Sequence, residues 1–180
     1  YQSRKDQAMA EAAGYSSLEA MHDAVINPGT PVMTKIREIF DELEYSYSEL
    51  DDGRLMVRNG SASIFFDQSS LDLISDSPKM IKIESPLLRD VTLSQGLYKE
   101  INNLSFMLPP LISVSVLEYE VGKKFLGKDV KSLLIMRAGL LESSCNKDSV
   151  GSLVALFAGL ADDLDDKLQS KFGGIKSFDD

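Results

Sequence analysis

The sequence predicts an α+β fold in which a twisted antiparallel sheet of about five or six strands is packed by helices. Two turn dipeptides, Asp52-Gly53 and Asn59-Gly60, separate short β-prone runs and indicate two successive hairpins. Apolar stripes at helical spacing lie before and after these runs. The strands come in groups instead of alternating singly with helices, which argues against a Rossmann-type arrangement.

The chain is long enough for one domain with a hydrophobic core. It has 180 residues, of which 43% are hydrophobic and 26% are charged, as in ordinary globular proteins. We expect an N-terminal helical extension over residues 1–28, an α+β domain over residues 29–175 and a tail over residues 176–180.

The charge balance and the apolar runs restrict the kinds of partner. A formal net charge of −9 disfavours nucleic acid, because phosphate contacts need clustered Lys and Arg. No apolar run reaches the roughly 20 residues of a membrane-spanning helix, so we expect no membrane insertion. The single cysteine, Cys145, excludes an internal disulfide and fits a reducing compartment. The sequence therefore indicates a cytoplasmic location, or an organelle if a targeting peptide preceded Tyr1.

Helices are expected before the first strand. The segment Arg4–Asn27 has a helical pattern in two pieces, and Pro28-Gly29 ends it. Thr30 then caps a new helix with Pro31 at its first position, where the missing N–H costs nothing. The apolar stripe of this helix is the first expected cover of the sheet. The stripe comprises Val32, Ile36, Ile39, Phe40 and Leu43.

The stretch Tyr45–Gln68 is expected to form a three-stranded meander. Asp52-Gly53 and Asn59-Gly60 are each suited to the two central positions of a type I′ turn. Alternation puts one set of apolar side chains on one face, and that face must be buried against another layer. The set comprises Tyr45, Tyr47, Leu55, Val57, Ala62, Ile64 and Phe66.

The second half of the chain is expected to complete the sheet and its cover. A break in the alternation of the first long strand suggests a bulge or a sheet edge. Gly173-Gly174 supplies a left-handed end to the last helix. The expected elements are a short strand at Met80–Glu84, a helix from a Thr92–Gln95 capping box to Leu108, long strands at Leu111–Val121 and Lys131–Glu142, and a helix from Asp148 to about Phe172.

Candidate catalytic and metal-binding residues are few. His22 is the only histidine, and its pairing with the distant Cys145 has no support in the sequence. Four aspartates near the C-terminus flank Leu164 on a helix, and a solvated face explains them better than a cation site. They are Asp162, Asp163, Asp165 and Asp166. We therefore expect no catalytic residue, no cofactor and no metal site.

Apolar residues also occupy strand positions that alternate away from the predicted core face. In the last long strand, either Leu134 or Met136 is expected to point away from the core beside Ile135. A sheet that is apolar on both faces needs a second cover, which is either a partner or the N-terminal helices. The partner-binding residues predicted from this pattern are Met56, Phe65, Met80, Leu134 and Met136.

Several segments resemble one known family. The segment Ala161–Gly174, with its Phe-Gly-Gly ending, is similar to the closing helix of YbjN-like proteins, especially the actinobacterial type, in the type III secretion chaperone-like superfamily. Leu97–Leu104 resembles the central helix of that family, and Ile36–Tyr45 with the Asp-Gly hairpin resembles its opening. The resemblance implies an α+β sheet-and-helix fold, a homodimer, and binding of unfolded client segments over hydrophobic patches without catalysis.

We accordingly expect a non-enzymatic, chaperone-like or regulatory module that binds a protein or peptide client and forms a homodimer. Apolar anchors would supply affinity, while the acidic composition would provide solubility and select basic client segments. The alternative is a structural subunit or assembly factor of a larger complex, in an organelle if a targeting peptide preceded Tyr1. An enzyme that uses Cys145 or the aspartates is the third hypothesis.

Overall fold

The computed structural model describes residues 31–69, 80–120, 124–125 and 127–177. Its centre is a seven-stranded antiparallel sheet with the strand order β1-β2-β3-β4-β8-β5, in which a short strand, β9, also pairs with β4. The predicted α+β fold is therefore confirmed. The expected helices over Arg4–Asn27 lie outside the described residues, and the domain boundaries at residues 28 and 175 stay predictions.

The described elements follow the predicted order. The helices are α3 (Pro31–Glu42), α4 (Gln95–Met107), α5 (Lys147–Phe172) and the short 3-10 helix η1 (Glu142–Ser144). The strands of the sheet are β1 (Tyr47–Glu49), β2 (Leu55–Asn59), β3 (Ala62–Ser69), β4 (Met80–Arg89), β5 (Ile112–Glu118), β8 (Ser132–Leu141) and β9 (Ile175–Lys176). Two further strands, β6 (Lys124–Phe125) and β7 (Lys128–Asp129), form a separate hairpin.

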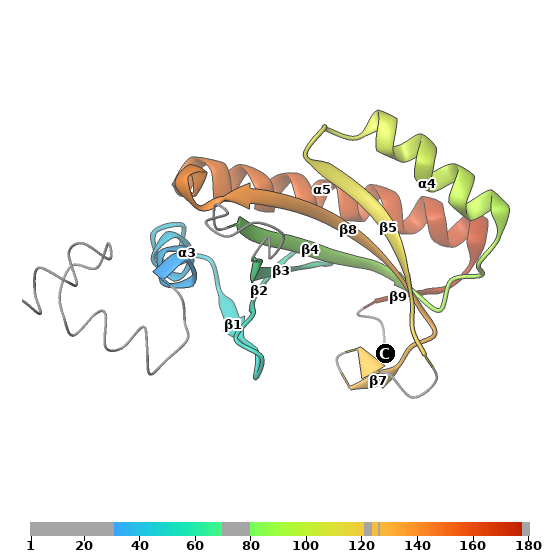
Figure 1. Cartoon of the computed structure of the whole chain (residues 1–180), viewed down its shortest axis with the longest axis horizontal. Coiled ribbons are helices and arrows are strands. Elements are labelled where there is room, and N and C mark those ends of the chain that lie inside the picture. The colour runs from blue at the N-terminus through green and yellow to red at the C-terminus, as the bar shows by residue number, and fades with distance from the viewer. Residues whose placement is uncertain (1–30, 70–79, 121–123, 126, 178–180) are drawn as a thin grey trace, which may run out of the picture.

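The helices α3, α4 and α5 cover the same face of the sheet. Figure 1 shows α5 lying along the sheet with α4 beside it, and α3 next to β1. Their apolar stripes share one hydrophobic core with the inward-facing strand residues. The predicted inward-facing set of the meander is confirmed. Its five members in strands β2 and β3 are buried in this core, and Tyr45 and Tyr47 pack against it.

Both predicted hairpins are present, but their turns are not of type I′. Asn59 pairs with Ala62, so the central residues are Gly60 and Ser61, and only Gly60 has a positive φ, of 63°. This is the pattern of a type II′ turn. In the other hairpin Gly53 has a φ of 83° and follows two residues of ordinary φ, as in a three-residue loop that ends in a left-handed glycine.

Strands β4 and β8 are the two longest strands and pair with each other at the centre of the sheet. The predicted short strand at Met80–Glu84 is therefore only the first half of β4. The register shifts between Pro86 and Leu88, so the bulge lies in β4. Strand β5 pairs with β8 without a register shift and forms the edge of the sheet, which confirms the edge alternative for that strand.

The helix caps are local and only partly as predicted. Ser94, not Thr92, caps α4, and its side chain accepts a hydrogen bond of 3.2 Å from Leu97 N. Helix α5 begins in a capping box formed by Asn146 and Ser149. It ends at Gly173, which has a φ of 69°, as the glycine pair predicted.

Replacing Leu134 by alanine should strongly destabilise the fold. Its side chain is fully buried in the main core, and such truncations cost about 2–5 kcal/mol. The matched variant Leu93→Ala removes the same atoms from an exposed residue and should cost less than about 0.5 kcal/mol. Urea unfolding followed by circular dichroism measures both, and equal losses would contradict the assignment of Leu134 to the core.

Candidate functional site

The face of the sheet opposite the three helices, which we call the second face, carries both apolar and charged side chains. Directly paired residues of an antiparallel sheet share a face. Met56 pairs with Phe65, Phe65 with Glu84, and Glu84 with Arg137, so this row crosses from β2 to β8. Residues at every second position along each strand extend the same face.

A second, smaller hydrophobic cluster lies on this face. Leu133 and Ile135 of β8 are buried there, separate from the main core. The break in alternation noted after Val116 has its explanation here, because Leu117 and Tyr119 continue the strand pattern onto the second face and pack in this cluster. The second cluster comprises Val130, Leu133 and Ile135, with Leu117, Tyr119 and Phe125 packed against them.

Phe65 lies on the second face but is only 2% exposed. The guanidinium carbon of Arg54 lies 5.4 Å from the centre of its ring, in cation–π geometry. The ring of Phe125, from the β6–β7 hairpin, meets it edge-on at a centroid distance of 6.3 Å. The predicted anchor is therefore covered by side chains from two surface turns.

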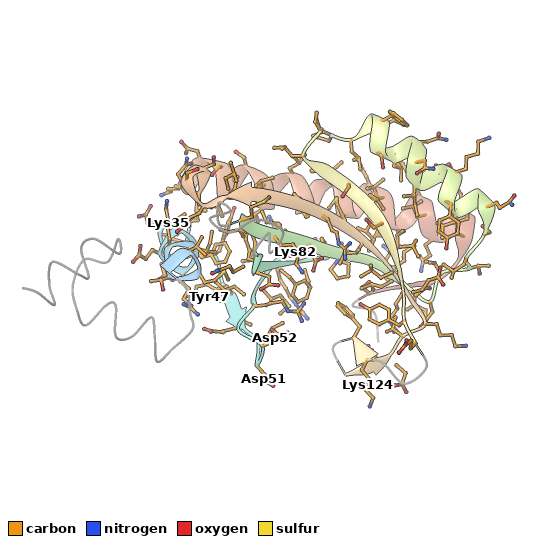
Figure 2. All side chains as sticks on the ribbon, in the orientation of Figure 1. Lys35, Tyr47, Asp51, Asp52, Lys82 and Lys124 are labelled. Atoms are coloured by element: carbon orange, nitrogen blue, oxygen red, sulfur yellow. The ribbon has the colours of Figure 1, made fainter. Side chains whose placement is uncertain are left out.

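Arg54 is held over Phe65 by an ion pair with Asp52. Arg54 Nε donates to Asp52 Oδ2 at 2.8 Å, and its Nη2 lies 2.7 Å from the same oxygen. The hydrogen bond from Arg54 is the main cause that lowers the pKa of Asp52, and it also raises the pKa of Arg54. Figure 2 shows that this turn and the hairpin marked by Lys124 project on the same side of the sheet, away from α5.

A row of alternating charges crosses the second face beside the apolar residues. Lys82 Nζ lies 3.5 Å from Asp67 Oδ2 and 3.4 Å from Glu84 Oε2. Arg137 Nε donates to Glu84 Oε1 at 2.9 Å. Since Glu84 is largely buried and each of these charges has an opposite neighbour, the row is internally compensated and adds little net charge to the face.

The structure places three of the five predicted partner-binding residues on the second face. Met56 and Met80 are half-buried there, and Met80 lies across Gly139, where an added Cβ would be 2.7 Å from its terminal methyl carbon. Phe65 is covered as described.

The placement of Leu134 and Met136 on the second face is wrong, because both are fully buried in the main core. Leu133 and Ile135 take the outward positions instead. The residues 132–136 show no clear alternation of polar and apolar side chains, but Arg137 indicates which positions of the strand face away from the core. A charged side chain in a central strand must face away from an apolar core, and Ile135 shares its parity.

Cys145, one of the residues considered for catalysis, does not have the surroundings of a reactive nucleophile. Cys145 is buried, its Sγ donates to Leu141 O at 3.3 Å, and burial raises the pKa of the thiol, which disfavours the reactive thiolate. His22 lies outside the described residues. In the part of the chain that the structure describes, no three His, Cys, Asp or Glu side chains are grouped so that they could hold a metal ion.

The sequence suggested one solvated environment for the four aspartates of α5, but the structure gives them different environments. Asp162 accepts a hydrogen bond from Ser61 Oγ, and Asp163 is exposed. Asp165 is only 6% exposed, and Lys176 Nζ lies 3.4 Å from its Oδ1 and 2.7 Å from Asp166 Oδ1. The prediction of a fully solvated acidic face is therefore wrong for Asp165, because β9 folds back over that part of the helix.

The fold and the second face define a class of protein: an α+β domain whose sheet carries a hydrophobic cluster on each face. Within the described ranges, no helix has the length and apolar character that crossing a membrane requires. Residues 32–180 match the family described as T3SS (YopN, CesT) and YbjN peptide-binding chaperone 1. The chain belongs to this family, which confirms the resemblance and supports a non-enzymatic, peptide-binding role. No curated protein matches the chain.

Replacing Asp165 by asparagine should stabilise the protein at pH 7. Burial is the main cause that raises the pKa of Asp165 above its ordinary value of 3.8, against the attraction of Lys176. A raised folded-state pKa means that stability is lost as the pH rises through the interval between the unfolded and folded values. The gain from Asp165→Asn should therefore shrink as the pH falls from the raised folded-state pKa towards 3.8, and should be lost below 3.8.

Urea unfolding at pH 7 and at acidic pH measures this difference. The control is Asp163→Asn, which removes the same charge from an exposed position of the same helix. A loss of stability in Asp165→Asn at pH 7 would show that the ion pair with Lys176 outweighs the cost of burial.

Proposed function

We propose that the chain binds an extended apolar segment of a client protein across the second face, without catalysis, and that it does so as a homodimer. The observation that supports binding there is the second cluster, which puts buried apolar side chains on the side of the sheet away from the main core. An ordinary antiparallel sheet with one covered face carries polar side chains on the other. The free thiol of Cys145 supports a reducing, cytoplasmic setting.

The contacts around Phe65 indicate what kind of side chain the surface accepts. Phe125 reaches the ring of Phe65 from outside the sheet and packs edge-on against it. A client side chain of similar size can make the same contact beside it or in its place. Met56 on the adjacent strand is half-buried, and methionine adapts its shape to different partners. Large apolar or aromatic client residues are therefore the expected anchors.

The charged row makes the same surface selective among clients. Lys82, Glu84 and Arg137 pair with one another across β4 and β8. Compensated pairs within an interface add little affinity, but they disfavour a client that would bury an unpaired charge against them. Affinity on this face is accordingly assigned to the apolar residues on either side of the row.

Removing an apolar side chain from the second face should weaken peptide binding. The full chain is screened against an array of synthetic peptides, and the peptides that bind are measured in solution by fluorescence polarisation. Met56→Ser and Phe125→Ser should each weaken binding about tenfold, as loss of an interface anchor does. Leu156→Ser, on the helical side of the molecule, is the matched control.

A photo-reactive residue at position 56 tests what occupies the face. Cross-links to the bound peptide support the proposal, and cross-links only to residues 1–28 of the same chain would overturn it. Unchanged peptide affinity in both second-face variants, while circular dichroism shows that they are folded, would also overturn it.

The surface at β5 and the end of α4 supports self-association. Phe106 is 91% exposed, Met107 is 80% exposed and Leu111 is 66% exposed. They lie beside the outer edge of β5, where the backbone N–H and C=O groups pair with no other described strand. From Ile112 to Leu117 this strand has no charged residue, whereas exposed edges are usually protected by charge, proline or shortness.

A second copy of this chain fits that edge. Two β5 strands related by a two-fold axis would pair antiparallel, and each would then place its Glu118 opposite the apolar start of the other. No like charges face each other in this arrangement. The exposed residues of the two α4 ends would be covered in the same interface.

Light scattering coupled to size exclusion should show a dimer for the unmodified chain and a monomer for Met107→Asp. A buried, unpaired carboxylate at the interface costs several kcal/mol. Leu156→Asp, which introduces the same charge on α5, should remain dimeric. A monomer in the unmodified chain at every concentration, or a dimer in Met107→Asp, would contradict the proposed interface.

A further inference from the structure

A cavity of about 630 Å³ lies where the segment after β4 and the segment before β8 meet Tyr119 and the end of β7. Its lining combines the apolar residues Val91 and Val130 and the polar residues Tyr119 and Ser132 with the charged residues Asp90, Asp129 and Lys131. This volume falls within the range of about 300–1,000 Å³ that is typical of ligand pockets. An apolar wall with a few convergent polar groups is also typical of them.

The wall of the cavity is built in advance by the ends of β4 and β8. Asp90 adopts a positive φ of 55°, its N–H donates to Ser132 O at 2.8 Å, and its Oδ1 accepts from Lys131 N at 2.8 Å. Ser132 Oγ donates to Val91 O at 3.1 Å. These bonds join residues 41 or 42 positions apart in the chain, so the lining has a fixed geometry before any ligand enters.

The charges of the lining favour a cation. Among the described residues, Asp90 Oδ2 and the carboxylate of Asp129 have no hydrogen-bond partner. Two carboxylates against the single ammonium group of Lys131 leave one excess negative charge. The whole chain has a net charge of −9, and a field of that sign raises the local concentration of basic groups.

The cavity is continuous with the proposed peptide-binding surface. Tyr119 and Val130 line the cavity and also belong to the second cluster. A client segment that covers the second cluster therefore has a side chain within reach of the cavity. The geometry points to this cavity as the subsite for one basic side chain, arginine or lysine, of the client, an inference that rests on the proposed function.

Each part of a basic side chain has a matching group in the cavity. The aliphatic stem packs against Val91 and Val130, as the stems of long charged side chains do on apolar surfaces. The cationic end lies over the ring of Tyr119, which attracts it through the ring quadrupole. The carboxylate of Asp129 and the second oxygen of Asp90 accept its hydrogen bonds.

The test titrates the full chain with N-acetylarginine amide and, as a neutral analogue of the same shape, N-acetylcitrulline amide. Backbone amide resonances of Val91, Val130 and Ser132 are followed by two-dimensional NMR. The arginine compound should shift these resonances in a saturable way and bind about threefold or more tightly than the citrulline compound, as expected for a partly exposed charge pair. Equal binding, or no shift at these amides, would overturn the inference.

Two variants separate charge from shape. Asp129→Asn keeps the size of an exposed side chain and should weaken the arginine compound about threefold, without affecting the citrulline compound. Asp163→Asn removes one negative charge from the exposed side of α5 and should leave both affinities unchanged. An effect of Asp163→Asn as large as that of Asp129→Asn would show that only the overall charge matters, and would overturn the subsite.

The outcome is distinguishable from that of the proposed function. If peptides bind the second face but the arginine compound does not shift the cavity resonances, the subsite alone fails. If the arginine compound binds as described but no peptide on the array binds, the proposed function fails and the preference of the cavity for a basic group stands.

Discussion

The pairing of β4 with β8 is the constraint on which the rest of the structure depends. These two central strands carry the register from the meander to β5, and Arg137 opposite Glu84 joins them by a hydrogen bond of 2.9 Å. A shift of one residue would exchange every side chain between the two faces. The core under α5 and the cluster on the second face are therefore two results of one register, and neither can be changed without the other.

Strand β8 explains why this sheet has apolar side chains on both faces. Its apolar run from Leu133 to Met136 supplies both faces at once, with Leu134 in the main core and Ile135 in the second cluster. The described helices α3, α4 and α5 cover the first face, and on the second face the small β6–β7 hairpin contributes the ring of Phe125. The cluster built in this way is fixed by the core behind it, and the chain belongs to a family described as peptide-binding chaperones.

Much of the fold could be predicted because its signals are local. Alternation identified the buried face of the meander, and the glycines at 53, 60 and 173 marked places where the chain takes a positive φ. The same reasoning misplaced Leu134 and Met136, since four consecutive apolar residues contain no alternation. Of the predicted site, Met56, Phe65 and Met80 were assigned to the correct face. The contacts of Arg54 and Phe125 with the ring of Phe65 depend on how two turns fold over the sheet, which strand parity does not specify.

The sequence by itself determined the α+β class, the order of the elements, the hairpin positions and the family resemblance, because each depends on residues that are close together in the chain. The tertiary structure decided which face each residue of β8 occupies, how deeply Asp165 is buried, and that Asp90, Tyr119 and Asp129 line one cavity. These features depend on contacts between distant segments, and their geometry is set by strand register and by the packing of helices on the sheet, which no local pattern specifies.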